Sequence, residues 1–365
     1  MSTETNVPRP EPEVAERFQS AAGRRKNERD DVFPDRRPVS KVGGLRLPAW
    51  RGPSPRGAGR IDRPQENGMK LPHHGRYGYS PIHQRPTYEW PNGSRIAFTL
   101  YNNIEQFAFR AGLGGDSATT GAAQSQRNYA WREYGNRVGI WAYFDLLDEY
   151  GLPASHNVNA AVLEACPQIV ERLNARGDEY VAHGRANAER QDGMWEEDEA
   201  RLIAESTATI TRLAGARPTG WMGPYFAQSA VTLDLLAEAG YEYVLDWPAD
   251  DQPFWMRTRA GRILSVPYPL EVNDIPAMIS RQEPARDFEF IIRDQFDEML
   301  RRSEKYPLVF GISCHPFVVG QPFRMQVLRR ALDHVLGQRD RLWIARPGEI
   351  ARYCAGLPAG IVPDC

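Results

Sequence analysis

Between Arg95 and Tyr353 the sequence alternates between short apolar runs and longer amphipathic stretches. Runs such as RIAFTLYN, ASHNVN, EYVA and LVFGISC have strand character, and amphipathic segments with helical spacing separate them. Repeated over about 260 residues, this order predicts parallel strands with helices outside them, and the count favours a closed or nearly closed (β/α) barrel. An open, doubly wound sheet is the alternative. The chain lacks both GxGxxG after the first strand and GxxxxGK[ST], the usual phosphate-binding signatures of that alternative.

The composition divides the chain into three predicted parts. Residues 1–65 are rich in Arg, Pro, Gly and acidic residues, and a segment of this kind cannot bury enough surface to fold, so it is predicted to be a flexible arm. The barrel domain is predicted at residues 66–356, and a short tail at 357–365. Residues Leu71 to Glu89 predict an extended segment that wraps the domain. The Gly, Ala, Ser and Thr stretch from Gly112 to Gln126 predicts a loop that covers a site.

Charge and cysteine content exclude several classes of protein. The chain has 365 residues, 41% of them hydrophobic, and a formal net charge of −2. Such a charge gives no electrostatic reason to expect nucleic acid or a membrane surface as partner. No apolar run is long enough for a membrane span, and the amino terminus resembles neither a secretory signal nor a transit peptide, so a cytoplasmic location is expected. The cysteines show no metal-binding spacing and are expected to be free thiols: Cys166, Cys314, Cys354 and Cys365.

Polar and aromatic residues gather where the predicted strands end. In a parallel barrel the carboxyl ends of the strands hold the active site. Here they carry Asn102, Asn103, Glu105, His183, Trp221, Asp250, Asp251 and His315. Taken singly, each has a structural explanation, such as a loop cap for Glu105 or a core position for Trp221. Their convergence on one rim nevertheless predicts a functional site.

Several ordered motifs carry a family resemblance. HGRANAERQ, RPTGWMGP, DWPADDQP and CHPFVVGQPFR resemble motifs of the polysaccharide deacetylase (NodB-homology) family, and specifically of its allantoinase-like, cyclic-imidase-like branch. The resemblance runs from about Arg76 to Tyr353 and implies a distorted (β/α) barrel of about seven strands, in agreement with the alternation. It also implies a homo-oligomer.

This chain departs from the family pattern at the metal site. Metal-dependent members hold a divalent ion with an aspartate pair after the first strand and an H-x-x-x-H motif. In this chain Glu105 stands at the metal-binding aspartate position without a preceding carboxylate, and Asn187 follows His183 where a second histidine would stand. A carboxylate, an imidazole and an amide make a poor zinc site. No metal cofactor is therefore expected; the alternative is a zinc ion held by Glu105, His183 and Asn187.

A mechanism for amide hydrolysis follows as a hypothesis. It needs a group that activates water, a group that stabilises the oxyanion and an acid for the leaving nitrogen. Glu105 is expected to orient the water, His183 to position water or polarise the carbonyl, and His315 to protonate the nitrogen. The expected supporting residues are Asp250 or Asp251, which would orient the His315 ring, and Arg217, which would pair with Glu105. A compact, planar substrate would be bound by Asn103, Asn187, Trp221, Tyr225 and Trp247.

The expected function is hydrolysis of a non-peptide carbon–nitrogen bond in a small amide, cyclic imide or ureide. A metal-dependent carbohydrate N-deacetylase is the second candidate. A third is a catalytically silent barrel that binds a ligand or a protein, which the missing aspartate pair favours. The retained Glu105, His183 and His315 weigh against the silent barrel.

Overall fold

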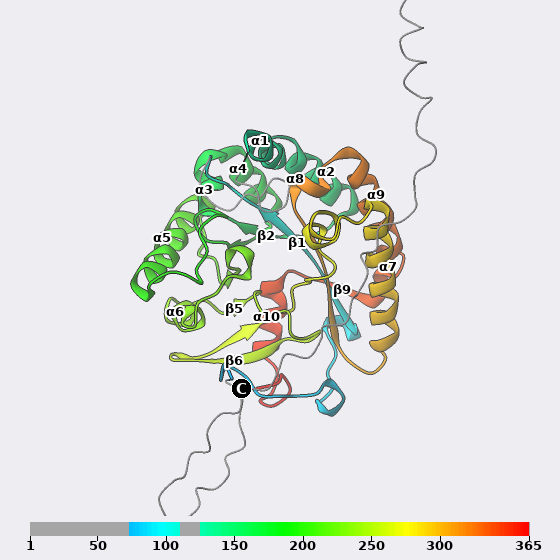
Figure 1. The fold of residues 1–365 in the computed structure, drawn as a ribbon. Helices are drawn as coiled ribbons and strands as arrows, with labels where there is room; N and C mark the ends of the chain where they lie inside the picture. The colour runs from blue at the N-terminus through cyan, green and yellow to red at the C-terminus, as the bar shows by residue number, and fades with distance from the viewer. Residues whose placement is uncertain (1–72, 110–124, 365) are drawn as a thin grey trace, which may run out of the picture. The chain divides into compact units, whose positions relative to one another are not determined.

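The computed structural model describes residues 73–109 and 125–364, and these residues form the (β/α) barrel that the alternation predicts (Figure 1). The predicted arm at 1–65 and nearly all of the predicted covering loop lie outside the described residues. The strands are β1 (Ile96–Ile104), β2 (Ser155–Val158), β3 (Glu179–Ala182), β4 (Gly220–Trp221), β5 (Tyr243–Val244), β6 (Phe254–Thr258), β7 (Gly261–Ser265), β8 (Leu308–Cys314) and β9 (Leu342–Ile344).

The described strands form one sheet in the order β6-β7-β5-β4-β3-β2-β1-β8, with β9 added beside the first half of β1. All pairs are parallel except β6 with β7, which form an antiparallel hairpin. Without β6 and β9 the path holds seven parallel strands. Within the described residues no strand pairing joins β8 to β7, and the barrel is open there. The chain after β7 occupies this seam, where Ser313 N donates to Val272 O at 3.0 Å.

The helices from α1 to α9 lie around the outside of the strands, whereas α10 packs on a second apolar cluster that includes Tyr101 and Tyr243 (Figure 1). The described helices are α1 (Gln126–Tyr134), η4 (a π-helical turn, Gly135–Gly139), α2 (Ile140–Tyr150), α3 (Ala160–Ala165), α4 (Pro167–Arg176), α5 (Glu196–Ala214), α6 (Thr232–Glu238), η6 (a π-helical turn, Ile275–Ser280), α7 (Ala285–Arg302), α8 (Pro316–Val319), α9 (Pro322–Leu336) and α10 (Pro347–Ala355). Four 3₁₀ turns complete the described chain: η2 (Ile82–Gln84), η3 (Pro91–Gly93), η5 (Pro224–Phe226) and η7 (Arg339–Arg341). The helical segment from Ala160 to Arg176 is interrupted at Cys166, because the proline that follows lacks an N–H and starts a new helix, α4.

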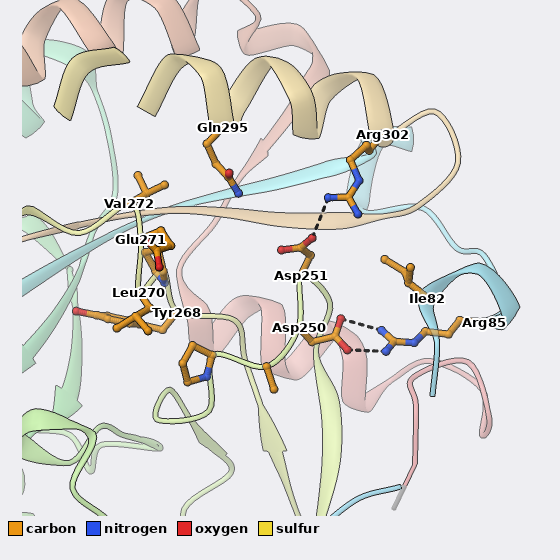
Figure 2. A pocket seen from close by; sticks show the side chains of 13 residues that line it. Ile82, Arg85, Asp250, Asp251, Tyr268, Leu270, Glu271, Val272, Gln295 and Arg302 are labelled. Atoms are coloured by element: carbon orange, nitrogen blue, oxygen red, sulfur yellow. Dashed lines mark hydrogen bonds and ion pairs between the residues drawn. The ribbon is translucent and has the colours of Figure 1, made fainter. Parts of the chain in front are cut away.

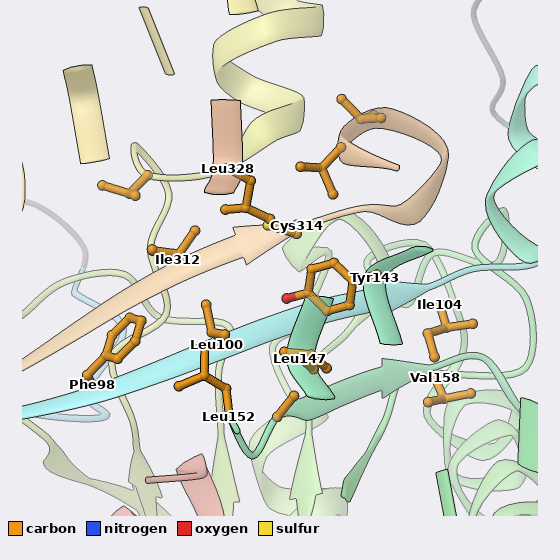
Figure 3. Packing of buried hydrophobic residues seen from close by; sticks show 14 of the residues in the cluster. Phe98, Leu100, Ile104, Tyr143, Leu147, Leu152, Val158, Ile312, Cys314 and Leu328 are labelled. Carbon is orange, nitrogen blue, oxygen red and sulfur yellow. The ribbon is translucent and has the colours of Figure 1, made fainter. Parts of the chain in front are cut away.

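The largest apolar cluster lies between the strands and the outer helices. Figure 3 shows side chains of β1 and β8, including Phe98, Leu100 and Ile312, packed with Tyr143 of α2 and Leu328 of α9. All five are at most 2% exposed, and burial of each large apolar side chain contributes about 1.5–3 kcal/mol. This packing fixes β1 and β8 side by side, and with them the residues that follow their ends.

The segment before β1 wraps the barrel, as predicted. Arg76 donates from both terminal nitrogens to the Asp234 carboxylate, at 2.7 and 2.8 Å. The Trp90 side chain is buried, and its indole N–H donates to Leu308 O at 3.1 Å. This segment is therefore an integral part of the packed barrel.

None of the described helices combines the length and the apolar character that a membrane crossing needs. Cys166, Cys314 and Cys354 are free thiols, as predicted, and Cys365 lies outside the described residues. After α10 the chain lies against β6, where Trp255 N donates to Pro363 O at 2.9 Å. The predicted domain limits at 65 and 356 stay predictions.

Candidate active site

Three strand ends deliver the central residues. Glu105, His183 and His315 each come directly after the last residue of β1, β3 and β8. The parallel register aligns Ile104 with Val158, and Val158 with Ala182, so the ends of β1 and β3 lie at one level. Because the strand path brings these ends to the same rim, the three side chains meet there.

Both imidazoles face one oxygen of Glu105. His315 Nε2 lies 3.5 Å from Oε1, and His183 Nε2 lies 3.8 Å from the same atom. All three side chains are less than 10% exposed. The carboxylate is therefore held between two rings in a site with little access to bulk water.

The other ring nitrogens define the proton positions. His183 Nδ1 lies 2.6 Å from Met222 O, and because a carbonyl only accepts, Nδ1 carries the proton. In the neutral ring, Nε2 of His183 is thus an acceptor. His315 Nδ1 lies 2.6 Å from Asp274 Oδ1, while the His315 backbone N–H donates to Asp274 Oδ2 at 2.7 Å. Asp274 therefore fixes both the ring and the backbone of His315.

The charges favour an ionised carboxylate beside a protonated imidazole. Burial acts to raise the pKa of Glu105, but the charge of His315 and the contacts with both imidazoles outweigh it and hold that pKa at about 2. Burial acts to lower the pKa of His315, but Asp274 and Glu105 outweigh it and raise that pKa to about 9. At neutral pH, Glu105 is negative and His315 is positive.

A cavity of about 180 Å³ opens onto these groups. It is lined by Glu105, Arg132, His183, Asn187, Met222, Tyr225, Phe226, Tyr268, Asn273, Ile275, Pro276 and His315. Tyr225 and Phe226 adopt φ angles of 60° and 56°, a left-handed conformation that is strained for aromatic residues. This turn follows β4 and makes one wall of the cavity.

Asp250 and Asp251 lie elsewhere, and the expectation that one of them orients His315 is wrong. Figure 2 shows Asp250 paired with Arg85 and Asp251 paired with Arg302, beside a separate cavity of about 490 Å³. Asp251 O accepts from Val309 N, near the start of β8, whereas His315 follows the end of that strand. The residue that orients His315 is Asp274, which sequence reasoning missed.

Arg217 does not pair with Glu105, which corrects a second expectation. Its exposed guanidinium donates to Ala239 O and lies over the ring of Tyr241, 5.6 Å from the centroid. The side chain belongs to the outer surface of the barrel.

Two tryptophans expected in the substrate wall are also placed elsewhere. Trp221 is fully buried in the cluster between strands and helices, and its indole N–H donates to Gln191 Oε1 at 3.2 Å. Successive strand residues point to opposite faces, so Met222, and not Trp221, lines the cavity. Trp247 donates to Gln228 Oε1 at 2.9 Å and does not line the cavity either.

Of the two asparagines expected to bind substrate, one lines the cavity and the other does not. Asn103 is buried below the site, where Nδ2 donates to Tyr268 Oη at 3.0 Å and Oδ1 accepts from Asn157 at 2.8 Å. Asn187 does line the cavity, and its buried Oδ1 has no hydrogen-bond donor among the described residues. Asn187 and Tyr225 are therefore the two expected substrate-binding residues that the cavity contains.

The donor set fits a zinc ion poorly. Glu105 and His183 are two strong donors, but the third candidate is the amide of Asn187, which is a weak donor to zinc. In the described part of the chain, no cluster of three His, Cys, Asp or Glu side chains could hold a metal.

The fold and the site define a (β/α) barrel of the hydrolase class, with one carboxylate between two imidazoles at its rim. The family profile described as polysaccharide deacetylase matches residues 133–244. A Schizosaccharomyces pombe protein named for a proposed polysaccharide deacetylase activity is 25% identical over 305 residues, or 74% of this chain and 93% of its own. The Helicobacter pylori peptidoglycan deacetylase is 22% identical over 243 residues, which cover 58% of this chain and 82% of that protein.

Solved structures agree with this assignment. A Pseudomonas aeruginosa PAO1 protein with a proposed polysaccharide deacetylase activity has a TM-score of 0.67 and 26% identity, with 75% of this chain and 94% of that chain covered. An allantoinase shares the fold, with a TM-score of 0.68 and 24% identity; the match covers 82% of this chain and 99% of that chain. Residues 133–244 thus match the polysaccharide deacetylase family, and relatives and solved structures that align with most of the chain are described in the same terms. At this coarse level the chain is a hydrolase of carbon–nitrogen bonds.

Proposed function

We propose that this protein hydrolyses a carbon–nitrogen bond in a small amide, cyclic imide or ureide, with water activated by Glu105 and the leaving nitrogen protonated by His315. The observation that carries the proposal is the placement of His315 at a small cavity, with Nδ1 2.6 Å from Asp274 Oδ1 and Nε2 3.5 Å from Glu105 Oε1. At about 180 Å³ the cavity is smaller than the range of about 300–1,000 Å³ common for drug-sized ligands, which favours a compact substrate.

Glu105 and His183 are arranged to hold one water molecule. Glu105 Oε1 and His183 Nε2 are both acceptors and lie 3.8 Å apart. A water that donates one proton to each acceptor has its oxygen lone pair free to attack a carbonyl carbon. In this role His183 orients the water, because Met222 O keeps its proton on Nδ1.

His315 supplies the proton for the leaving nitrogen. With a pKa of about 9 it is protonated at neutral pH, and its Nε2 faces the cavity side of Glu105. When His315 gives up this proton, it also loses the positive charge that depresses the pKa of Glu105. The carboxylate therefore becomes a stronger base while the tetrahedral intermediate breaks down.

Other cavity residues fit an amide substrate. The Asn187 carboxamide can hydrogen-bond to the substrate amide and to the developing oxyanion. Met222 and Phe226 offer apolar walls that a flat ring or short chain would cover. The allantoinase that shares this fold acts, by its name, on a compact ureide, which supports the same substrate class here.

The proposal includes no metal cofactor, because the donor set at Glu105, His183 and Asn187 is weak for zinc. It includes a small molecule as the binding partner, neither nucleic acid nor membrane, and a cytoplasmic homo-oligomer as the working form. The family resemblance is the support for the oligomer.

The second candidate is a carbohydrate N-deacetylase, because the Schizosaccharomyces pombe and Helicobacter pylori relatives are both named as deacetylases. A turnover screen of purified protein against hydantoins, ureides, cyclic imides, formamides and N-acetyl sugars separates the candidates. Turnover of one of the first four classes supports the proposal. Turnover confined to N-acetyl sugars contradicts it, and inactivity on all classes supports the catalytically silent barrel.

A further inference from the structure

Arg132 is a cavity residue that the proposed mechanism does not use. It belongs to α1 and lines the same cavity as Glu105 and His315. Its Nε donates to Asn128 Oδ1 at 3.0 Å, one helical turn earlier. Its guanidinium carbon lies 3.8 Å from the ring centroid of Phe107. One face and one edge of the guanidinium are therefore fixed by the protein.

The guanidinium of Arg132 has an uncharged neighbour in the cavity, the side chain of Tyr225. Tyr225 lines the same cavity as Arg132. Burial raises the pKa of Tyr225, and the nearby charge of Arg132 acts against that rise. Among the described residues, no carboxylate forms an ion pair with Arg132. By contrast, Glu105 and Asp274 both contact His315. A half-buried guanidinium that stays charged in a cavity is suited to an anion from outside the chain.

We infer that Arg132, together with the Tyr225 hydroxyl, forms a subsite for an anionic group, and that the substrate is a small amide, imide or ureide bearing a carboxylate. The inference rests on the proposed function of this cavity. Two parallel N–H groups of a guanidinium match the two oxygens of a carboxylate, whereas an uncharged ring offers no such partner. The stacked Phe107 and the bond to Asn128 hold the guanidinium in place before the substrate binds.

The test compares two matched pairs of compounds. N-carbamoylglycine and its neutral amide, N-carbamoylglycinamide, form the first pair; hydantoin-5-acetic acid and its amide form the second. We expect the wild-type protein to prefer the acid of at least one pair by about 10- to 100-fold in kcat/KM, the range expected for a charged hydrogen bond. In Arg132→Met this preference should fall to less than about threefold, mainly through KM. Arg132→Lys should restore part of it, because the charge returns without the planar fork.

A rim arginine provides the control. Arg190 lies near the Tyr225 ring but pairs with Asp192 at the surface, so Arg190→Met should leave the preference unchanged. Circular dichroism and the thermal midpoint of Arg132→Met show whether the variant is folded. If the acids are not preferred in either pair, or if the preference survives in folded Arg132→Met, the subsite is overturned.

Binding separates this inference from the proposed function. Calorimetry with Glu105→Gln, which should bind without turnover, measures the affinity for each acid and its amide. Preferential binding of an acid that depends on Arg132, without turnover by the wild-type protein, supports the subsite and contradicts the proposed hydrolysis. Equal turnover of acid and amide supports the hydrolysis and overturns the subsite.

Discussion

Asp274 determines the protonation state of His315 more directly than any other single residue. It accepts from both Nδ1 and the backbone N–H of His315, and it is fully buried. A buried carboxylate at 2.6 Å favours the charged imidazole strongly, which is why the pKa of His315 is raised in spite of burial. The proton donor of the proposed reaction therefore depends on both His315 and Asp274.

We therefore predict that Asp274→Asn lowers kcat/KM by about 10²- to 10⁴-fold, the range for loss of a positioned acid. In the wild-type protein, activity should fall as the pH rises through about 9, because His315 then loses its proton. In Asp274→Asn this alkaline limb should move to lower pH, since the neutral amide no longer stabilises the imidazolium. A pH–rate profile of both proteins gives the result.

Asp250→Asn is the matched control for this prediction. It breaks the ion pair with Arg85 but lies away from the cavity, so stability should fall while the alkaline limb stays in place. If the alkaline limb moved in Asp250→Asn but not in Asp274→Asn, the role of Asp274 as the partner of His315 would be contradicted.

Chelation tests the metal-free mechanism. Because Glu105 and His183 are joined by only a weak third donor, Asn187, we expect substoichiometric zinc in protein purified without a metal-affinity tag. Prolonged treatment with chelator should leave turnover unchanged. Near-stoichiometric zinc together with chelator-sensitive turnover would make Glu105 a ligand in place of a base.

The site was only partly predictable from the sequence. Glu105, His183 and His315 could be predicted because each directly follows an apolar strand, and parallel strands end at one rim. Asp274 could not, since NDIPAMI has no periodicity and DWPADDQP offered a denser group of carboxylates. Arg132 was missed because its cavity position depends on how α1 packs.

At the scale of elements, η4 and α8 pack with their backbones in contact. A Cβ atom added to Gly139 would lie 2.0 Å from Pro316 O, and one added to Gly320 would lie 2.4 Å from Gly139 Cα. Both contacts are far below van der Waals distance, so glycine is required at these positions. Since α8 begins directly after His315, this contact fixes the chain at the proposed catalytic acid.

Gly139→Ala is therefore expected to lower the free energy of unfolding by about 1–3 kcal/mol, the usual cost of overpacking. It should also lower kcat, because Pro316 must move and His315 precedes it. Chemical denaturation and steady-state kinetics measure the two effects. The control is Gly193→Ala, where the added Cβ meets no atom within 4 Å and stability should change by less than about 0.5 kcal/mol. Equal stability of the two variants would contradict the close contact.

Most elements of the fold followed from local patterns. The runs that became β1, β3 and β8 were predictable because buried parallel strands are continuously apolar. The π-helical turn η4 was not, because its residues continue the helical pattern of α1 and α2. The open seam beside β8 depends on pairing between distant segments, which single runs do not specify.

At the scale of the whole molecule, the amino-terminal residues fall into two parts, the predicted arm at residues 1–65 and the segment that wraps the barrel. Residues 1–65 have a composition that supports no core, so a truncation that starts at Asn67 should keep its thermal midpoint. A truncation that starts at Glu89 removes the ion pairs of Arg76 and Arg85 and should lower the midpoint by several degrees. Differential scanning calorimetry measures both. A lower midpoint for the Asn67 truncation would show that the arm packs on the barrel.

The raised pKa of His315 also links the folding equilibrium to protons. Below about pH 6.5 the imidazole is charged in both the folded and the unfolded chain, and the stabilisation by Asp274 and Glu105 is fully present. Between about pH 6.5 and 9 the unfolded chain has released this proton and the folded chain still holds it, so folding takes up a proton. The stabilisation, of order 3 kcal/mol, is lost as the pH rises through this window. Unfolding free energies from pH 6 to 10 should show this fall, and His315→Gln should flatten it. Alkaline conditions therefore weaken the fold between about pH 6.5 and 9, before the folded protein itself loses the catalytic proton at about pH 9.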